Sequence, residues 1–239
     1  MADSRASDGD SDDMVPAPRR RARVRPEERY AEFVRTAVEL FSEEGFEAGT
    51  RELAQRLGVT QPLIYRYFPS KDDLIAAVYR EIYENRWKSA WRTGLEDESV
   101  PIRTRMLAFY TDYSDTIFTP EWLRIYLFAG LRGVDINRRY AGAVEREVLR
   151  PIAAAARRAI GLDPADDLLP EEVELFWTLH GGIFYYGVRE IVYGFEMPVD
   201  RATMIVNAVD TFLGGATAVL RRIQADHAPA GAGLRPKSG

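Results

Sequence analysis

Residues 50–71 read TRELAQRLGVTQPLIYRYFPSK. Leu53 and Leu57 lie on one side of the first half of this stretch, and Ile64 and Phe68 follow at i, i+4 spacing in the second half. Gly58 stands between the two halves, and glycine suits a sharp reversal because it adopts positive φ at little cost. The stretch therefore predicts two short helices joined by a glycine turn, which is typical of a helix-turn-helix motif.

The outer side of the second helix carries a mixture of polar and apolar residues. Gln61 can bond a base edge or a phosphate, and Pro62 and Leu63 offer apolar contacts to thymine methyl groups. The hydroxyls of Tyr65 and Tyr67 can reach phosphates. A plain helical hairpin, with its tyrosines packed under the next helix, is the alternative interpretation.

Charge is distributed unevenly along the chain. The net charge is −5, but residues 1–18 hold five aspartates and one arginine, whereas residues 50–71 hold four basic residues and one acid. A phosphate backbone responds to such local charge more than to the total. Together with the glycine turn, the local basic charge of residues 50–71 predicts DNA binding. Residues 19–25, RRRARVR, are either an arm that reaches phosphates or the minor groove, or a solvated basic linker.

Helix-start signals surround the motif. Thr50 and Thr60 are predicted N-caps of its two helices. Ser70 and Asp73 have capping-box spacing, so a third helix is expected to begin there and to run to about residue 92. Lys71 would lie at its N-terminus, where the ammonium group and backbone N–H groups can hold a phosphate. An amphipathic helix over residues 26–44 is expected to precede the motif.

At this point the residues resemble a known family. Residues 45–74, GFEAGTRELAQRLGVTQPLIYRYFPSKDDL, are similar to the DNA-binding motif of the TetR family of bacterial transcriptional repressors. The resemblance implies that Arg51, Gln61, Pro62 and Leu63 contact bases. It implies that phosphates are touched or supported by Thr50, Thr60, Tyr65, Tyr67 and Lys71.

Three positions depart from the family's namesake, which has an acid at Thr60, a hydroxyl at Leu63 and an aromatic residue at Arg66. A different operator is therefore expected. No family motif follows Leu74, so the resemblance identifies no ligand.

The rest of the chain keeps a helical rhythm, with helices expected over 121–132, 137–160 with a kink at Pro151, 170–193 and 200–223. The fold class is all-α. We expect an acidic tail and Arg-rich arm without order (1–25), a three-helix helix-turn-helix DNA-binding domain (26–74), a helical ligand-binding and dimerisation domain (75–226) and a disordered tail (227–239).

Several kinds of chemistry are disfavoured. The chain has no cysteine, which excludes disulfides, thiolate catalysis and zinc–cysteine sites. His180 has no second histidine with which to share a metal, and no phosphate-binding glycine loop occurs. We therefore expect no enzymatic activity, no cofactor and no metal. No apolar run suggests a membrane span, and the acidic start is no secretory signal, so a cytoplasmic protein is expected.

Glycines interrupt the last two predicted helices. Gly181, Gly182 and Gly187 lie in one and Gly214 and Gly215 in the other, each costing about 1 kcal/mol of helix stability relative to alanine. Close helix–helix approach would compensate, either within the chain or in a four-helix homodimer interface, which the resemblance also implies. Reading two half-sites about 34–36 Å apart independently favours a dimer.

Aromatic residues are dense in the middle of the chain. At helical spacing they more often form plain core, but the resemblance favours a pocket between helices. The candidate ligand-binding residues are Tyr110, Tyr113, Trp122, Phe128, Trp177, His180 and Phe184. Polar contacts could come from Arg103, Arg124 and His180.

These observations predict a homodimeric repressor that binds a palindromic double-stranded DNA operator. A small apolar or aromatic effector of unknown identity would release it by coupling two sites. The alternative is a helical small-molecule-binding protein, or a protein adaptor, whose hairpin does not bind DNA. The two hypotheses differ in one measurable property. A repressor should bind DNA with an affinity that falls steeply with salt, whereas the alternative proteins should show no such affinity.

Overall fold

The computed structural model describes residues 25–162 and 168–227, and every regular element in these ranges is helical. The predicted all-α class is confirmed. The disorder expected in residues 1–25 and 227–239 lies outside the described residues except at Arg25 and at His227, which is the last residue of α11. The N-terminal elements are α1 (Pro26–Glu44), η1 (Gly45–Glu47), α2 (Thr50–Leu57), α3 (Gln61–Tyr67), α4 (Lys71–Tyr79) and η2 (Arg80–Glu84). The following elements are α5 (Ser89–Glu96), α6 (Ile102–Ile117), α7 (Pro120–Arg132), α8 (Ile136–Val144), η3 (Glu145–Leu149), α9 (Arg150–Ala159), α10 (Pro170–Gly187), η4 (Val188–Val192) and α11 (Arg201–His227).

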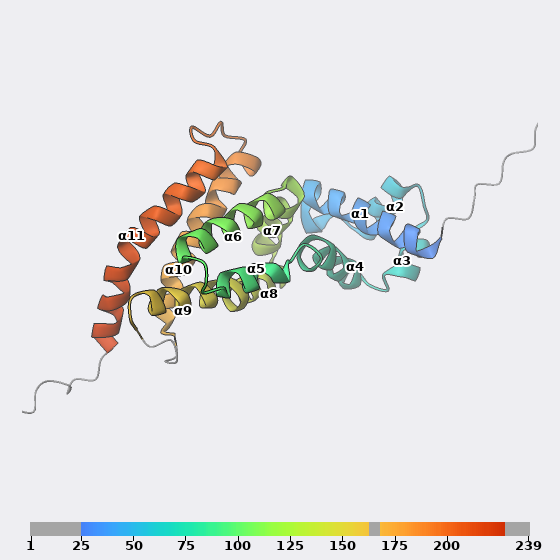
Figure 1. The fold of residues 1–239 in the computed structure, drawn as a ribbon. Helices are drawn as coiled ribbons and strands as arrows, with labels where there is room; N and C mark the ends of the chain where they lie inside the picture. The colour runs from blue at the N-terminus through green and yellow to red at the C-terminus, as the bar shows by residue number, and fades with distance from the viewer. Residues whose placement is uncertain (1–24, 163–167, 228–239) are drawn as a thin grey trace, which may run out of the picture.

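Helices α1 to α4 form one end of the molecule, and α10 and α11 lie toward the other (Figure 1). In the N-terminal part, Phe33 and Phe41 of α1 are buried with Leu53 of α2 and Ile64 of α3. These are the inward positions of the helical periodicity, so the hairpin packs against α1 through its apolar stripe. Helix α7 packs against both α1 and η1 and joins this unit to the remaining helices.

Local signals place most of the helix ends. Gly58 has a φ of 62° and ends α2, as the glycine turn predicts. The Ser70 hydroxyl accepts the Asp73 N–H at 3.1 Å, and the Asp73 carboxylate accepts the Ser70 N–H at 2.9 Å. The predicted capping box at the start of α4 is thereby confirmed.

The N-cap of α2 differs from the prediction. It is Gly49, and Thr50 is the first residue of the helix. The Glu52 carboxylate accepts the Gly49 N–H at 2.9 Å, which satisfies the helix end without the threonine hydroxyl. The Thr50 side chain is therefore available for contacts with α3.

The long third helix expected to reach residue 92 is interrupted. It passes into the π-helical turn η2 and ends at Glu84, and α5 begins at Ser89 after a turn. The break redirects the chain so that Trp91 packs on α6, where its indole N–H donates to Asp112 at 2.6 Å. A straight helix would not satisfy the two packing surfaces, because Tyr83 contacts α7 while Trp91 contacts α6.

Irregular turns also modify the later helices. The helix predicted over 137–160 contains the π-helical turn η3 just before Pro151, at the region where a kink was expected. The helix predicted over 170–193 consists of α10 and the π-helical turn η4. Asp200 caps the start of α11, because its carboxylate accepts the Thr203 N–H at 2.8 Å.

Helix α11 is long and apolar in composition. It contains a window with a mean hydropathy of 1.4, of which 22% is buried, so by length and composition alone it could cross a membrane. A single such helix is weak evidence for a span. It packs against α10 and α6, and an Arg103–Asp210 ion pair at 2.6 Å ties it to α6. Several of its apolar residues, among them Met204, Phe212 and Leu213, are only half-buried within one chain.

The glycines of α10 and α11 fall into two groups. A Cβ atom at Gly187 would lie 2.8 Å from the Phe118 ring, so this glycine permits close packing within the chain. A Cβ atom at Gly181, Gly182, Gly214 or Gly215 would meet no atom of the described residues within 4 Å. Close intrachain approach therefore accounts for the first glycine and for none of the other four.

Replacing Gly187 with alanine is expected to lower the free energy of unfolding by about 1–2 kcal/mol, since overpacking against Phe118 outweighs the gain in helix propensity. Gly94 in α5 provides the control, because a Cβ atom there meets no atom within 4 Å in the part of the chain that the structure describes. Gly94→Ala is expected to raise stability by up to about 1 kcal/mol. Urea denaturation of both variants measures the difference, and equal shifts would contradict the close contact.

Candidate functional site

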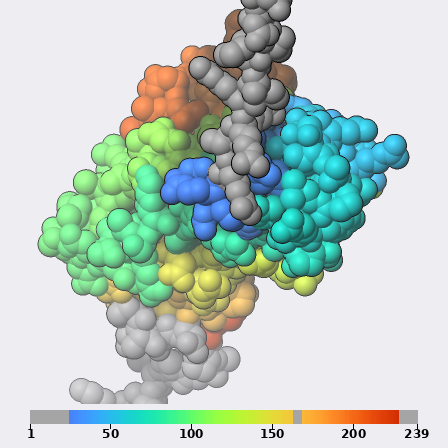
Figure 2. All heavy atoms as spheres, turned by 90° about the vertical axis from the view of Figure 1, so that its right-hand side faces the viewer, coloured from blue at the N-terminus to red at the C-terminus, as the bar shows by residue number. Residues whose placement is uncertain are grey.

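The end of the molecule that carries α1 to α4 faces the viewer in Figure 2, with α2 to α4 in cyan to teal. On this end Arg51, Thr60, Pro62 and Tyr65 are exposed. Half-buried positions are Gln61, Leu63, Tyr67 and Lys71. Eight of the nine predicted DNA-contacting residues thus retain accessible surface, and Thr50, the ninth, is buried.

Thr50 connects the two helices of the hairpin. Gln61 donates its amide N–H to the Thr50 hydroxyl at 2.9 Å, and the Thr50 hydroxyl donates to Tyr65 OH at 3.2 Å. The network fixes the side chains of Gln61 and Tyr65 relative to α2. Thr50 therefore positions its neighbours on α3.

The basic residues of the hairpin differ in their partners. Arg56 is paired with Glu43 at 2.7 Å and with Glu44 at 2.6 Å, and these carboxylates raise the pKa of its guanidinium. Arg51 and Arg66 are exposed and make no ion pair within the described part of the chain. The local positive charge available to a phosphate therefore comes from Arg51 and Arg66 more than from Arg56.

Lys71 and Tyr67 are partly engaged with the rest of the protein. The Lys71 ammonium donates to the carbonyl oxygen of Phe46 at 2.6 Å and ties the start of α4 to η1. Its other N–H groups remain donors. The Tyr67 ring packs against Phe33 with centroids 5.2 Å apart, so its body belongs to the edge of the core. Lys71 and Tyr67 thus connect the exposed side of the hairpin to η1 and to α1, respectively.

A small cavity of about 90 Å³ lies within the helical domain. Five of the predicted ligand residues line it: Tyr113, Trp122, Trp177, His180 and Phe184. Tyr126 and Tyr140 line it as well and were not among the predicted residues. The aromatic density around Tyr126 was a sequence signal for it, whereas nothing in the helical periodicity near residue 140 indicated that Tyr140 would meet α7.

Four other predicted residues lie outside this cavity. Tyr110 is fully buried beside it, between Phe109 and His180. Phe128 lies under η1, where a Cβ atom on Gly45 would come within 3.2 Å of its ring. Arg103 is paired with Asp210, and Arg124 is exposed on α7, so neither supplies a polar contact to the cavity.

Polar groups in the cavity wall are neutral. Burial lowers the pKa of His180 to about 4, so its imidazole is uncharged near pH 7. Its Nε2 lies 3.4 Å from Tyr113 OH, which is itself 2.8 Å from Tyr140 OH. Within the described residues, His180 Nδ1 and Trp122 Nε1 have no hydrogen-bond partner. Buried polar atoms of this kind are normally satisfied, by water or by a ligand.

Tyr83 links this cavity to the N-terminal helices. It lies in η2, which continues α4, and its hydroxyl donates to the Trp122 carbonyl oxygen at 3.3 Å. The ring centroids of Tyr83 and Trp122 are 5.0 Å apart. A change in the position of Trp122 would therefore displace Tyr83 and, with it, the end of α4.

Comparison with known proteins gives the relatives of the chain. Residues 33–78 match a family model described as bacterial regulatory proteins, tetR family. The class C tetracycline repressor protein of Escherichia coli is 36% identical over 84 residues, which cover 32% of this chain and 38% of that protein. The HTH-type transcriptional repressor NicS of Pseudomonas putida is 33% identical over 132 residues, covering 52% and 61%. The chain thus spans less than two thirds of either curated relative.

Solved structures extend the likeness to most of the chain. Mycobacterium smegmatis AmtR aligns with a TM-score of 0.54 at 24% identity, covering 86% of this chain and 98% of that chain. A TetR-like transcriptional regulator from Rhodococcus sp. RHA1 aligns with a TM-score of 0.60 at 14% identity, covering 82% and 99%. At these identities the likeness shows the fold, an N-terminal helix-turn-helix domain followed by a helical domain.

Proposed function

We propose that this chain is a member of the TetR family of bacterial regulatory proteins and acts as a homodimeric transcriptional repressor, released from a palindromic operator by a small apolar or aromatic effector. Proteins of this family are transcriptional regulators rather than enzymes. The observation that carries the proposal is the α2–α3 surface, where the Thr50 hydroxyl joins the side chains of Gln61 and Tyr65. Arg51, the next residue of α2, is exposed and has no ion-pair partner among the described residues.

DNA binding would place α3 in the major groove. Gln61, Pro62 and Leu63 lie in its first turn, the part of a recognition helix that contacts base edges. Arg51 at the start of α2 would read a base, and Thr60, Tyr65, Tyr67 and Lys71 would hold phosphates. Phosphate contacts of this kind fix the register on the duplex, whereas base contacts specify the sequence.

Dimerisation would use the uncovered faces of α10 and α11. The open space above Gly181, Gly214 and Gly215 lets a second helix approach closely, which compensates for their cost in helix stability. Tyr185, which is 53% exposed, extends the apolar surface beside them. A two-fold pair of such surfaces forms a four-helix contact and gives the two reading surfaces that a palindrome requires.

Release would begin in the aromatic cavity. An effector there would move Trp122, and through Tyr83 it would move η2 and α4. Lys71 at the other end of α4 is hydrogen-bonded to the Phe46 carbonyl oxygen of η1. Because α3 ends at Tyr67, just before α4 begins, a displacement of α4 would also shift α3. To change occupancy decisively, the effector must favour the non-binding state by about 5.5 kcal/mol.

Selection of bound duplexes from a random pool tests the proposal. We expect enrichment of an inverted repeat whose half-sites lie one helical turn, or a multiple of it, apart. Binding of the selected site should weaken steeply with salt, as phosphate contacts require. Neutral aromatic compounds are then screened for those that raise the melting temperature and dissociate the complex. Absence of any enriched repeat would refute DNA reading, whereas enrichment without a releasing compound would refute only the effector.

A further inference from the structure

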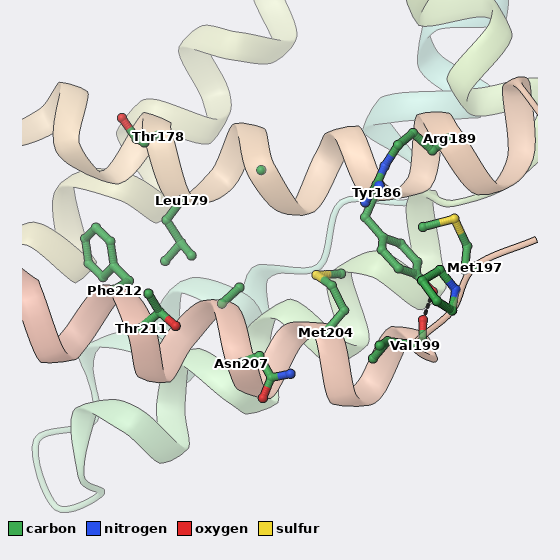
Figure 3. Close-up of a pocket in the computed structure, with 13 residues that line it drawn as sticks. Thr178, Leu179, Tyr186, Arg189, Met197, Val199, Met204, Asn207, Thr211 and Phe212 are labelled. Carbon is green, nitrogen blue, oxygen red and sulfur yellow. Dashed lines mark hydrogen bonds between the residues drawn. The ribbon is translucent and has the colours of Figure 1, made fainter. Parts of the chain in front are cut away.

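A second, larger hollow lies between α10 and α11, on the other side of α10 from the aromatic cavity. Its volume is about 600 Å³, within the range of small-molecule sites. Leu179 and Phe212 lie toward one end, Met204 in the middle and Met197 at the other end, so its walls are largely apolar (Figure 3). We call this hollow the α10–α11 groove.

One positive charge stands at the end of this groove. Arg189 lies with its guanidinium above Tyr186, 5.8 Å from the ring centroid (Figure 3). It has no ion-pair partner among the described residues, and its buried Nε makes no hydrogen bond there. The neighbouring Glu190 does not neutralise it by pairing, because that carboxylate is bonded to Arg201 at 3.0 Å. Among the described residues, those that line the groove include no acid.

An apolar wall with one uncompensated cation favours a particular kind of ligand. A carboxylate can accept two parallel N–H bonds from a guanidinium, and such charge-assisted bonds are stronger than neutral ones. Neither a cation nor a purely apolar molecule would satisfy the arginine. On the α10 side, the groove extends from Thr178 to Arg189, which lies in η4 directly after α10. Eleven residues of helix at 1.5 Å per residue span about 16 Å, so the groove has room for an elongated molecule.

We propose that the α10–α11 groove binds an amphipathic carboxylate, with its elongated apolar body between the two helices and its carboxylate on Arg189. This site is separate from the aromatic cavity, and its existence does not depend on DNA reading. Because α10 and α11 also carry the proposed dimer contact, a ligand here would lie next to the second protomer.

Titration calorimetry of the full chain with decanoate tests the site. We expect saturable binding with one decanoate per chain, and Arg189→Gln should weaken it by about tenfold or more, because it removes charge-assisted hydrogen bonds. Arg189→Lys should restore part of the affinity. Arg221→Gln is the matched control, since Arg221 is exposed on α11 outside the groove and should leave binding unchanged.

Two further comparisons separate the head group from the apolar body. Decanol should bind more weakly than decanoate and should not respond to Arg189→Gln. Gly182→Leu should abolish binding of both, because Gly182 lines the groove and a Cβ atom there meets no described atom within 4 Å, so the leucine side chain can occupy the groove. Equal decanoate affinity of the native chain and Arg189→Gln would overturn the proposal, as would absence of saturable binding. So would sedimentation showing that Gly182→Leu dissociates a dimer while decanoate binding persists, because a second copy would then occupy the groove.

Discussion

Replacing Arg51 with glutamine is expected to weaken binding to the selected operator by about ten- to a hundredfold, the cost of about 1–3 kcal/mol for losing one good base contact. The guanidinium is exposed at the first turn of α2 and has no ion pair among the described residues. Its loss should therefore leave the free energy of unfolding nearly unchanged. Fluorescence anisotropy with operator and scrambled duplexes measures both specific and non-specific affinity.

Arg56 provides a matched control for this experiment. It lies on the same helix and carries the same charge, but it is paired with Glu43 and Glu44 of α1. Arg56→Gln should change operator affinity much less, and its effect on stability should also be small because such half-exposed ion pairs contribute little. If both variants lose operator affinity equally, α2 supplies only general positive charge. If neither loses affinity, Arg51 does not touch DNA.

The N-terminal domain could be predicted from sequence to near the residue because its signals are local. Gly58 needs positive φ, Ser70 and Asp73 cap each other, and Ile64 and Phe68 repeat at helical spacing. Each of these depends on residues within one or two turns. The one error in this part, Thr50 as N-cap, arose because Gly49 with Glu52 satisfies the same helix end.

The helical domain was predicted less completely because its decisive contacts join distant segments. The break after Glu84 follows from packing on α6 and α7 at once, which periodicity within one helix cannot reveal. Tyr140 of α8 lines the aromatic cavity, whereas Phe128 packs near Gly45 of η1. In the sequence both are simply apolar positions. The α10–α11 groove was missed for the same reason, since Arg189 meets apolar residues of α11 only in the folded chain.

The glycines illustrate how the structure separates interpretations that the sequence left together. Gly187 is required by Phe118 of the same chain, whereas open space lies over Gly214 and Gly215. The sequence could show that all of them weaken a helix, but not which neighbour compensates. Substitution of Gly187 is therefore expected to destabilise the fold, whereas substitution of Gly214 and Gly215 is expected to prevent dimerisation.

Replacing both Gly214 and Gly215 with leucine is expected to prevent dimerisation and to lower operator affinity by about 10²- to 10⁴-fold. The lower affinity follows because a single reading surface loses the effective concentration that links two half-sites. Each chain should still fold, since leucine has a higher helix propensity than glycine and a Cβ atom at either position meets no described atom within 4 Å. Sedimentation equilibrium and operator binding on the same samples measure the two effects.

Gly94→Leu is the control for this variant, because Gly94 is also an exposed helical glycine with open space around it but lies on α5. It should keep both the dimer and the operator affinity. A Gly214→Leu/Gly215→Leu protein that remains dimeric with native affinity would place the interface elsewhere. A monomeric protein with native affinity would instead show that one reading surface suffices, and the requirement for a palindrome would fall with it. Because the helical content of each variant can be followed by circular dichroism, loss of assembly is distinguished from loss of fold.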